Sequence, residues 1–123
     1  MKMLIITTLI AFLSIGISSY GPKKPYLAEK DEIIAQAKKE LDATMADPES
    51  KLRKYILKNQ IKGEFIFDIT IAEKGAVLTV FSVSSDADDI KKQNLMKDGV
   101  KALVFNFKMP KDKSYKFQYT FNI

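Results

Sequence analysis

Residue types that commonly do chemistry are scarce in this chain of 123 residues. It has no His and no Cys, which removes the commonest general base and metal ligand and every disulfide or thiolate site. The densest acidic group, Asp86, Asp88 and Asp89, could offer oxygen ligands to Ca²⁺ or Mg²⁺. It lacks the loop glycine and distal glutamate of an EF-hand, and acids at a helix start are explained by the helix dipole. We therefore expect no metal, no cofactor and no enzyme activity.

Composition and charge fit one small folded domain. Hydrophobic residues make up 46% of the chain, and the net charge of +5 comes almost entirely from Lys, because Arg53 is the only Arg. Without an Arg cluster or an aromatic RNA-binding motif, such a charge is typical of a solubilising surface. We expect no nucleic-acid partner.

The first 19 residues have the pattern of a secretory signal peptide. Lys2 gives a basic start, an uncharged apolar stretch runs from Met3 to Ile17, and small residues follow at Ser18 and Ser19. A signal peptide combines a charged start, an apolar core of about 7–15 residues and small exit residues. The stretch is short for a membrane span, which needs about 20 apolar residues, although an uncleaved anchor is the alternative. We expect an exported protein, periplasmic or secreted, whose mature form has no membrane span. The mature chain is expected to begin near Ser19 or Tyr20, and N-terminal sequencing of the protein recovered from its cell would check this.

The clearest pattern lies in the last nine residues, Tyr115 to Ile123. Every odd position is aromatic or Ile and every even position is polar. Successive side chains of a strand point to opposite faces, so this spacing predicts a strand with one apolar and one polar face. An uncovered strand also offers unpaired N–H and C=O groups to an extended partner. A purely structural strand, protected from pairing by Lys116 and neighbouring lysines, is the other interpretation.

The remaining elements must position that strand. Residues 20–26 are a predicted tether, and a helix is expected over 27–46, either packed on the domain or semi-detached as a stalk. Its apolar stripe comprises Ile34, Ala37, Leu41 and Met45, with Ile33 beside it. A second helix is expected to begin with Asp47 as N-cap and Pro48 as first helical residue, and to end near Asn59.

The middle of the chain predicts a hairpin and then a third helix. Residues 64–71 alternate, with apolar residues at every odd position, and residues 72–75 form the loop, with Gly75 in the left-handed region. The return strand spans 77–84, with Val77, Thr79, Phe81 and Val83 expected on one face. The third helix, capped by Asp86 or Asp88, is expected to reach Met109-Pro110, and Gly99 inside it suggests a close contact with the sheet.

This order of elements predicts an α+β fold. The hairpin makes the first two strands antiparallel neighbours, and the last strand follows a crossover helix. It can therefore lie beside the first strand and antiparallel to it. We expect a three-stranded antiparallel sheet of order 2-1-3 with the helices on one face, so that the last strand is an edge.

Two short motifs give the stretch 52–123 a resemblance to a known family. Asn59-Gln60-Ile61-Lys62-Gly63-Glu64 leads from the second helix into the first strand, and Phe105-Asn106-Phe107-Lys108-Met109-Pro110 leads out of the third helix. With the spacing of the strands, they resemble the C-terminal domain of TonB and its TonB-like periplasmic relatives from bacteria. The chain has only four Pro and no long Pro-rich segment, so the resemblance covers the folded module and not the transduction of membrane energy.

The resemblance completes the expected division of the chain and implies a binding site. Residues 1–19 are the signal peptide, 20–46 the tether and amphipathic helix, and 47–123 the TonB-like domain. In that family an extended receptor segment pairs with the last strand. The expected function is protein binding by β-strand addition, without an enzyme activity; an inhibitor or chaperone-like binder is the alternative, and a small carboxylate-dependent hydrolase is the alternative from another class. The partner-binding residues would be Tyr115, Lys116, Phe117, Gln118, Tyr119, Thr120 and Phe121.

Overall fold

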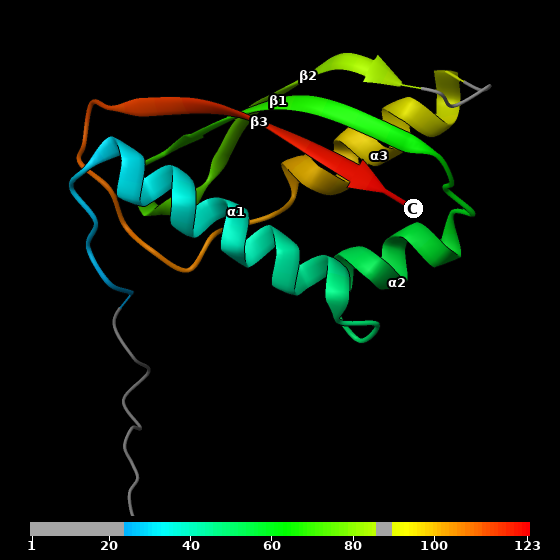
Figure 1. The fold of residues 1–123 in the computed structure, drawn as a ribbon, viewed down its shortest axis with the longest axis horizontal. Coiled ribbons are helices and arrows are strands. Elements are labelled where there is room, and N and C mark those ends of the chain that lie inside the picture. The colour runs from blue at the N-terminus through cyan, green and yellow to red at the C-terminus, as the bar shows by residue number, and fades with distance from the viewer. Residues whose placement is uncertain (1–23, 86–89) are drawn as a thin grey trace, which may run out of the picture.

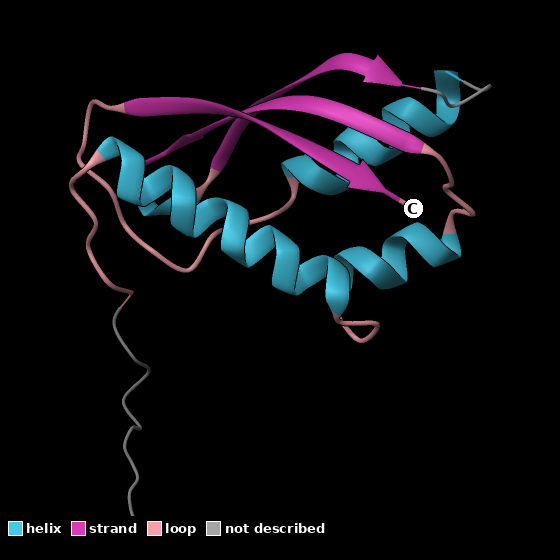
Figure 2. Cartoon of the chain, viewed as in Figure 1, coloured by secondary structure: helices cyan, strands magenta, loops and turns pink. Residues whose placement is uncertain are grey.

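The computed structural model describes residues 24–85 and 90–123, and Figure 1 shows a layer of helices packed against one face of a sheet. The strands form one antiparallel sheet of order β2-β1-β3. The predicted fold class and strand order are therefore confirmed. The elements, in chain order, are α1 (Lys30–Ala46), α2 (Lys51–Lys58), β1 (Glu64–Ala72), a 3₁₀ turn (Glu73–Gly75), β2 (Val77–Ser85), α3 (Ile90–Lys101) and β3 (Ser114–Asn122) (Figure 2).

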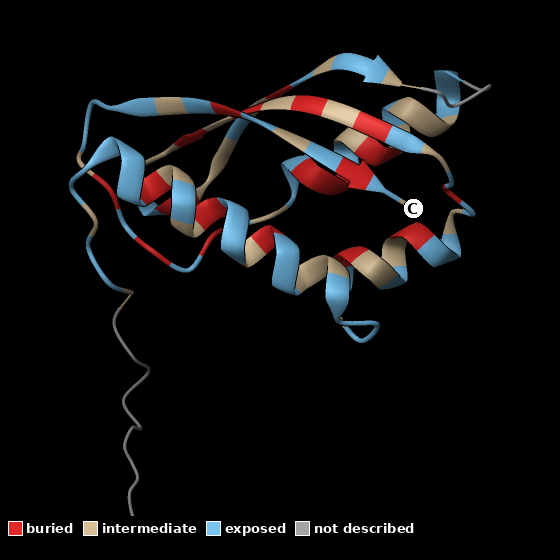
Figure 3. Cartoon of the chain, viewed as in Figure 1, coloured by how far each residue is buried: buried red, intermediate tan, exposed pale blue. Residues whose placement is uncertain are grey.

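The core lies between the sheet and the helices. Buried and less buried residues alternate along β1 and β3 (Figure 3), because only one face of the sheet is covered. α1 contacts β3, α3 contacts β2, and α2 contacts both other helices. Phe65, Phe67 and Ile69 of β1 share this core with Phe121 of β3 and Val100 of α3, as the alternation of the sequence predicts.

The first helix belongs to the same packed unit. Ile33, Ala37 and Leu41 are fully or almost fully buried, and Ile34 and Met45 lie at the margin of the core. The buried stripe is thus centred on Ile33 and not on Ile34, and α1 begins at Lys30, three residues after the predicted start. α1 packs on the domain and is not a detached stalk.

The predicted start of α2 at Asp47 is wrong, because Ser50 is its N-cap. The Ser50 hydroxyl accepts a hydrogen bond from the Arg53 N–H (3.2 Å) and donates one to the Thr44 carbonyl (2.9 Å). Asp47 instead forms a turn, since its Oδ1 accepts from the Glu49 N–H (2.9 Å). The end of the helix at Asn59 is as predicted.

The predicted end of the third helix at Met109-Pro110 is also wrong. α3 ends at Lys101, and the chain then runs extended, with Phe105, Phe107 and Met109 buried at every second position. Backbone hydrogen bonds hold this segment to distant parts of the chain, where the N–H groups of residues 105 and 108 donate to the carbonyls of residues 75 and 25 (both 2.8 Å). These bonds satisfy backbone groups that a helix would have paired internally.

Gly99 approaches another helix and not the sheet. A Cβ at this position would lie 2.7 Å from Cε2 and 2.8 Å from Cδ2 of Tyr55 in α2. The Tyr55 hydroxyl donates to the Leu95 carbonyl (2.7 Å), so the ring is held across α3. Glycine is therefore required for the close packing of α2 against α3.

β2 differs from the predicted strand in which residues share a face. Its register against β1 shifts between Ile66 and Phe67 and again between Thr70 and Ile71, and each shift places an extra residue in β2. Val80 is consequently buried, and Phe81 is 60% exposed on the open face of the sheet. The predicted common face of Val77, Thr79, Phe81 and Val83 is wrong, because the bulges break the alternation.

Candidate functional site: the open edge of the last strand

The structure places the predicted site residues 115–121 within β3, at one end of the strand order. Phe117 and Phe121 are buried, Tyr115 and Tyr119 are half-buried, and their rings face the helices. The even residues are exposed, and Gln118 Nε2 lies 3.5 Å from Asp68 Oδ1. The aromatic side chains thus pack in or against the core and do not form a ligand cleft. The polar side chains lie on the open face.

The register shows which backbone groups of β3 are free. Gly63 and Ile123 exchange both of their backbone hydrogen bonds, at 3.2 and 3.0 Å. Pairs in an antiparallel ladder alternate between those that exchange both bonds and those that exchange none. The register of β1 with β3 is uninterrupted, so odd residues of β3 bond to β1. The N–H and C=O groups of the even residues, Lys116, Gln118, Thr120 and Asn122, point away from β1.

The outer side of β3 is open in the described part of the chain. β3 is the last strand of the sheet order, and neither of the isolated bridges in residues 24–85 and 90–123 involves it. The other edge, β2, carries the two register shifts, and Val104 bridges to Ala76 just before it. Bulges and coverage are common protections against edge pairing. β3 is therefore the more regular of the two edges.

Tyr119 ties this strand to the helix below it. Its hydroxyl donates a hydrogen bond to Asp42 Oδ1 on α1. Burial raises the pKa of Tyr119 above its usual value, and the hydrogen bond and charge of Asp42 raise it further. Tyr119 therefore stays neutral and keeps its hydroxyl as a donor at any physiological pH. This contact holds α1 under β3 without using the backbone of the edge.

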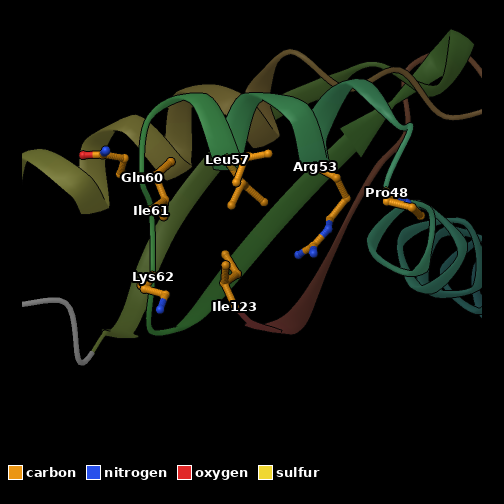
Figure 4. Close-up of a pocket in the computed structure, with 8 residues that line it drawn as sticks. Pro48, Arg53, Leu57, Gln60, Ile61, Lys62 and Ile123 are labelled. Atoms are coloured by element: carbon orange, nitrogen blue, oxygen red, sulfur yellow. The ribbon is translucent and has the colours of Figure 1, made fainter.

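Sequence reasoning missed a pocket at the end of the same edge. It has a volume of about 630 Å³ and lies between α2, the loop that follows α2, and the end of β3. In Figure 4 the Arg53 side chain reaches from α2 toward Ile123, the residue that follows β3. Leu57 is 80% exposed although it is a large apolar residue. The lining residues are Pro48, Arg53, Ile56, Leu57, Gln60, Ile61, Lys62 and Ile123.

The described residues contain neither a membrane-crossing helix nor a metal cluster. No helix within residues 24–85 and 90–123 is long and apolar enough to span a bilayer. The same residues hold no group of three or more acids, His or Cys arranged to bind a metal ion. The predicted signal peptide, the acids Asp86, Asp88 and Asp89, and the predicted cap of the third helix lie outside the described residues.

The fold and the edge together define a small α+β domain with a regular open strand. Comparison of the chain with models of protein families, with curated proteins and with solved structures finds no match.

Proposed function

We propose that this protein is an exported, non-enzymatic interaction module that binds an extended protein segment by adding it as a fourth strand at the outer edge of β3. The carrying observation is the uninterrupted register with β1, which leaves a continuous row of outward N–H and C=O groups at Lys116, Gln118, Thr120 and Asn122. Main-chain hydrogen bonds supply much of the affinity in strand addition. The resemblance to TonB C-terminal domains implies the same use of the last strand.

The half-buried aromatic residues of β3 indicate which side chains the partner segment should carry. Residues paired across two strands have their side chains on the same face. Alternate side chains of an added strand would thus lie beside Tyr115 and Tyr119 on the helix side, where some ring surface is exposed. The others would lie beside Lys116 and Gln118 on the open face. We expect the partner to alternate apolar and polar residues.

Proline at an edge position tests this proposal. Gln118→Pro and Thr120→Pro each remove one outward N–H, and proline is tolerated on an edge strand when its missing N–H would face solvent. Peptides would be selected from a displayed nonapeptide library on the mature protein, and their affinities measured by fluorescence anisotropy. We expect each variant to lose about tenfold or more in affinity, which corresponds to ~1.4 kcal/mol, while circular dichroism shows an intact fold.

Two controls separate edge pairing from other effects. Gln118→Ala keeps the N–H and should keep the affinity, whereas Tyr119→Pro removes a donor to β1 and should lower stability. Full affinity in the folded Gln118→Pro and Thr120→Pro variants would show that β3 is only architecture. If the protein forms a homodimer and Gln118→Pro dissociates it, the occupant of the edge is a second copy of this chain. That result would contradict the proposal of a separate partner.

A further inference from the structure

The pocket at the end of β3 is continuous with the proposed binding edge. Ile123 follows β3, pairs with Gly63, and lines the pocket. It is an odd residue, so its side chain lies on the helix side of the sheet, like those of Phe117 and Phe121. A residue of an added strand beside Ile123 would have its side chain on that same side. It would therefore meet the pocket between the strand and α2.

The lining of the pocket combines apolar residues with two cations. Its apolar residues are Ile56, Leu57, Ile61, Ile123 and Pro48. Arg53 and Lys62 are its charged residues, and no acid lines it. The sequence shows the same asymmetry, because residues 51–62 contain five cations and no acid: Lys51, Arg53, Lys54, Lys58 and Lys62.

Arg53 is the half-buried member of this basic group. Glu49, on the preceding turn, pairs with Lys54 at 3.3 Å. In the part of the chain that the structure describes, no acid forms an ion pair with the Arg53 guanidinium. The hydrogen bond of Arg53 to the Ser50 hydroxyl comes from its backbone N–H and does not involve the guanidinium. A guanidinium presents several donors in a planar fork that fits a carboxylate. The geometry and the charge thus favour an anionic occupant.

We propose that the pocket anchors one end of the added strand and selects an acidic-apolar sequence. An apolar side chain of the partner lies against Leu57, Ile61 and Ile123, and the carboxylate of an Asp or Glu two positions away pairs with Arg53. The spacing follows from the strand, since residues i and i+2 share a face and lie about 7 Å apart. This inference rests on the proposed function, because strand addition brings the partner to the pocket.

The same displayed library provides the test. Peptides selected on the wild-type protein are expected to carry a large apolar residue with Asp or Glu two positions from it. Arg53→Gln should lower the affinity for these peptides about tenfold, as expected for the loss of one charge-assisted pair. A synthetic analogue with Asn or Gln in place of the acid should bind the wild type weakly and should lose nothing further in Arg53→Gln.

Lys54→Gln is the matched control, because it removes the same charge from the same helix outside the pocket. It should change affinity less than about twofold, as is usual for an exposed charge. Leu57→Ala removes apolar surface that is exposed in the free protein, so it should leave the stability of the fold unchanged. The same surface contacts the bound peptide in our proposal, so the affinity for the peptides should fall several-fold.

The possible failures are distinguishable. If Gln118→Pro abolishes peptide binding but Arg53→Gln has no more effect than Lys54→Gln, the edge binds its partner and the anchor proposal is wrong. If the wild-type protein selects no peptide, both proposals are wrong. A homodimer that dissociates in Arg53→Gln or Leu57→Ala would identify a second copy in the pocket and would also overturn the anchor proposal.

Discussion

Phe67→Ala and Phe121→Ala are each expected to lower the free energy of unfolding by ~3–5 kcal/mol. Phe67 is completely buried and Phe121 almost so, and their ring centroids lie 5.8 Å apart across β1 and β3. Truncation of either ring leaves a cavity that the neighbouring strands can only partly close. Since domains of this size are stable by about 5–15 kcal/mol, each variant should unfold at a much lower urea concentration.

Substitutions on the open face of the same strands provide the control. Thr70→Ala and Asn122→Ala should change the free energy of unfolding by about 0.5 kcal/mol or less. Their side chains lie on the opposite face from Phe67 and Phe121, and Asn122 is exposed. Equal losses in the two sets of variants would mean that the alternation of faces along β1 and β3 is wrong.

The strands and their order could be predicted because each depends on a local pattern. β1 and β3 carry apolar residues at every odd position, and a strand of this kind that slips by one residue would turn those side chains to the solvent. Gly75 marks the reversal between β1 and β2, and its φ of +76° is the left-handed conformation that the sequence predicts. A crossover helix then leaves few positions for the last strand.

The start of α2 and the end of α3 were predicted wrongly because two local patterns fit the sequence equally well at each of these places. Asp47 and Ser50 are both favourable helix caps, and only the contact of Ser50 with Thr44 in the preceding helix distinguishes them. The residues that follow Lys101 have apolar spacings that fit a helix, but Phe105, Phe107 and Met109 also fit an extended segment. Long-range hydrogen bonds favour the extended conformation of this segment over a helix. The sequence does not show them, since the backbone bonds to residues 25, 27 and 75 exist only in the folded chain.

The candidate site was predictable only in outline. Alternation alone indicates that β3 is one-sided, but it does not show which N–H groups point outward. That required the pairing of Gly63 with Ile123 and the uninterrupted register. The pocket was missed because α2, the loop after it and the end of β3 form it together. Its one signal in the sequence was the run of cations without acids from Lys51 to Lys62.

Gly75→Ala is expected to cost ~2–5 kcal/mol in unfolding free energy. Left-handed backbone costs a residue with a Cβ about 1–2 kcal/mol. The new Cβ would also lie 2.4 Å from the Phe105 carbonyl oxygen and 2.9 Å from that of Phe107. These are backbone atoms of a buried segment whose Phe105 N–H bonds to the Gly75 carbonyl (2.8 Å). The segment must shift and disturb packed rings, at a further cost of about 1–3 kcal/mol.

Lys74→Gly separates these two contributions. Lys74 precedes Gly75, has a φ of +67°, and is exposed. Glycine there relieves a left-handed conformation and also raises the entropy of the unfolded chain, and these effects oppose each other. We expect stability to stay equal or to rise by up to about 1 kcal/mol in thermal or urea denaturation. If Gly75→Ala loses no more than about 2 kcal/mol, backbone conformation alone explains the glycine, and the close approach of residues 105–107 to the hairpin loop is wrong.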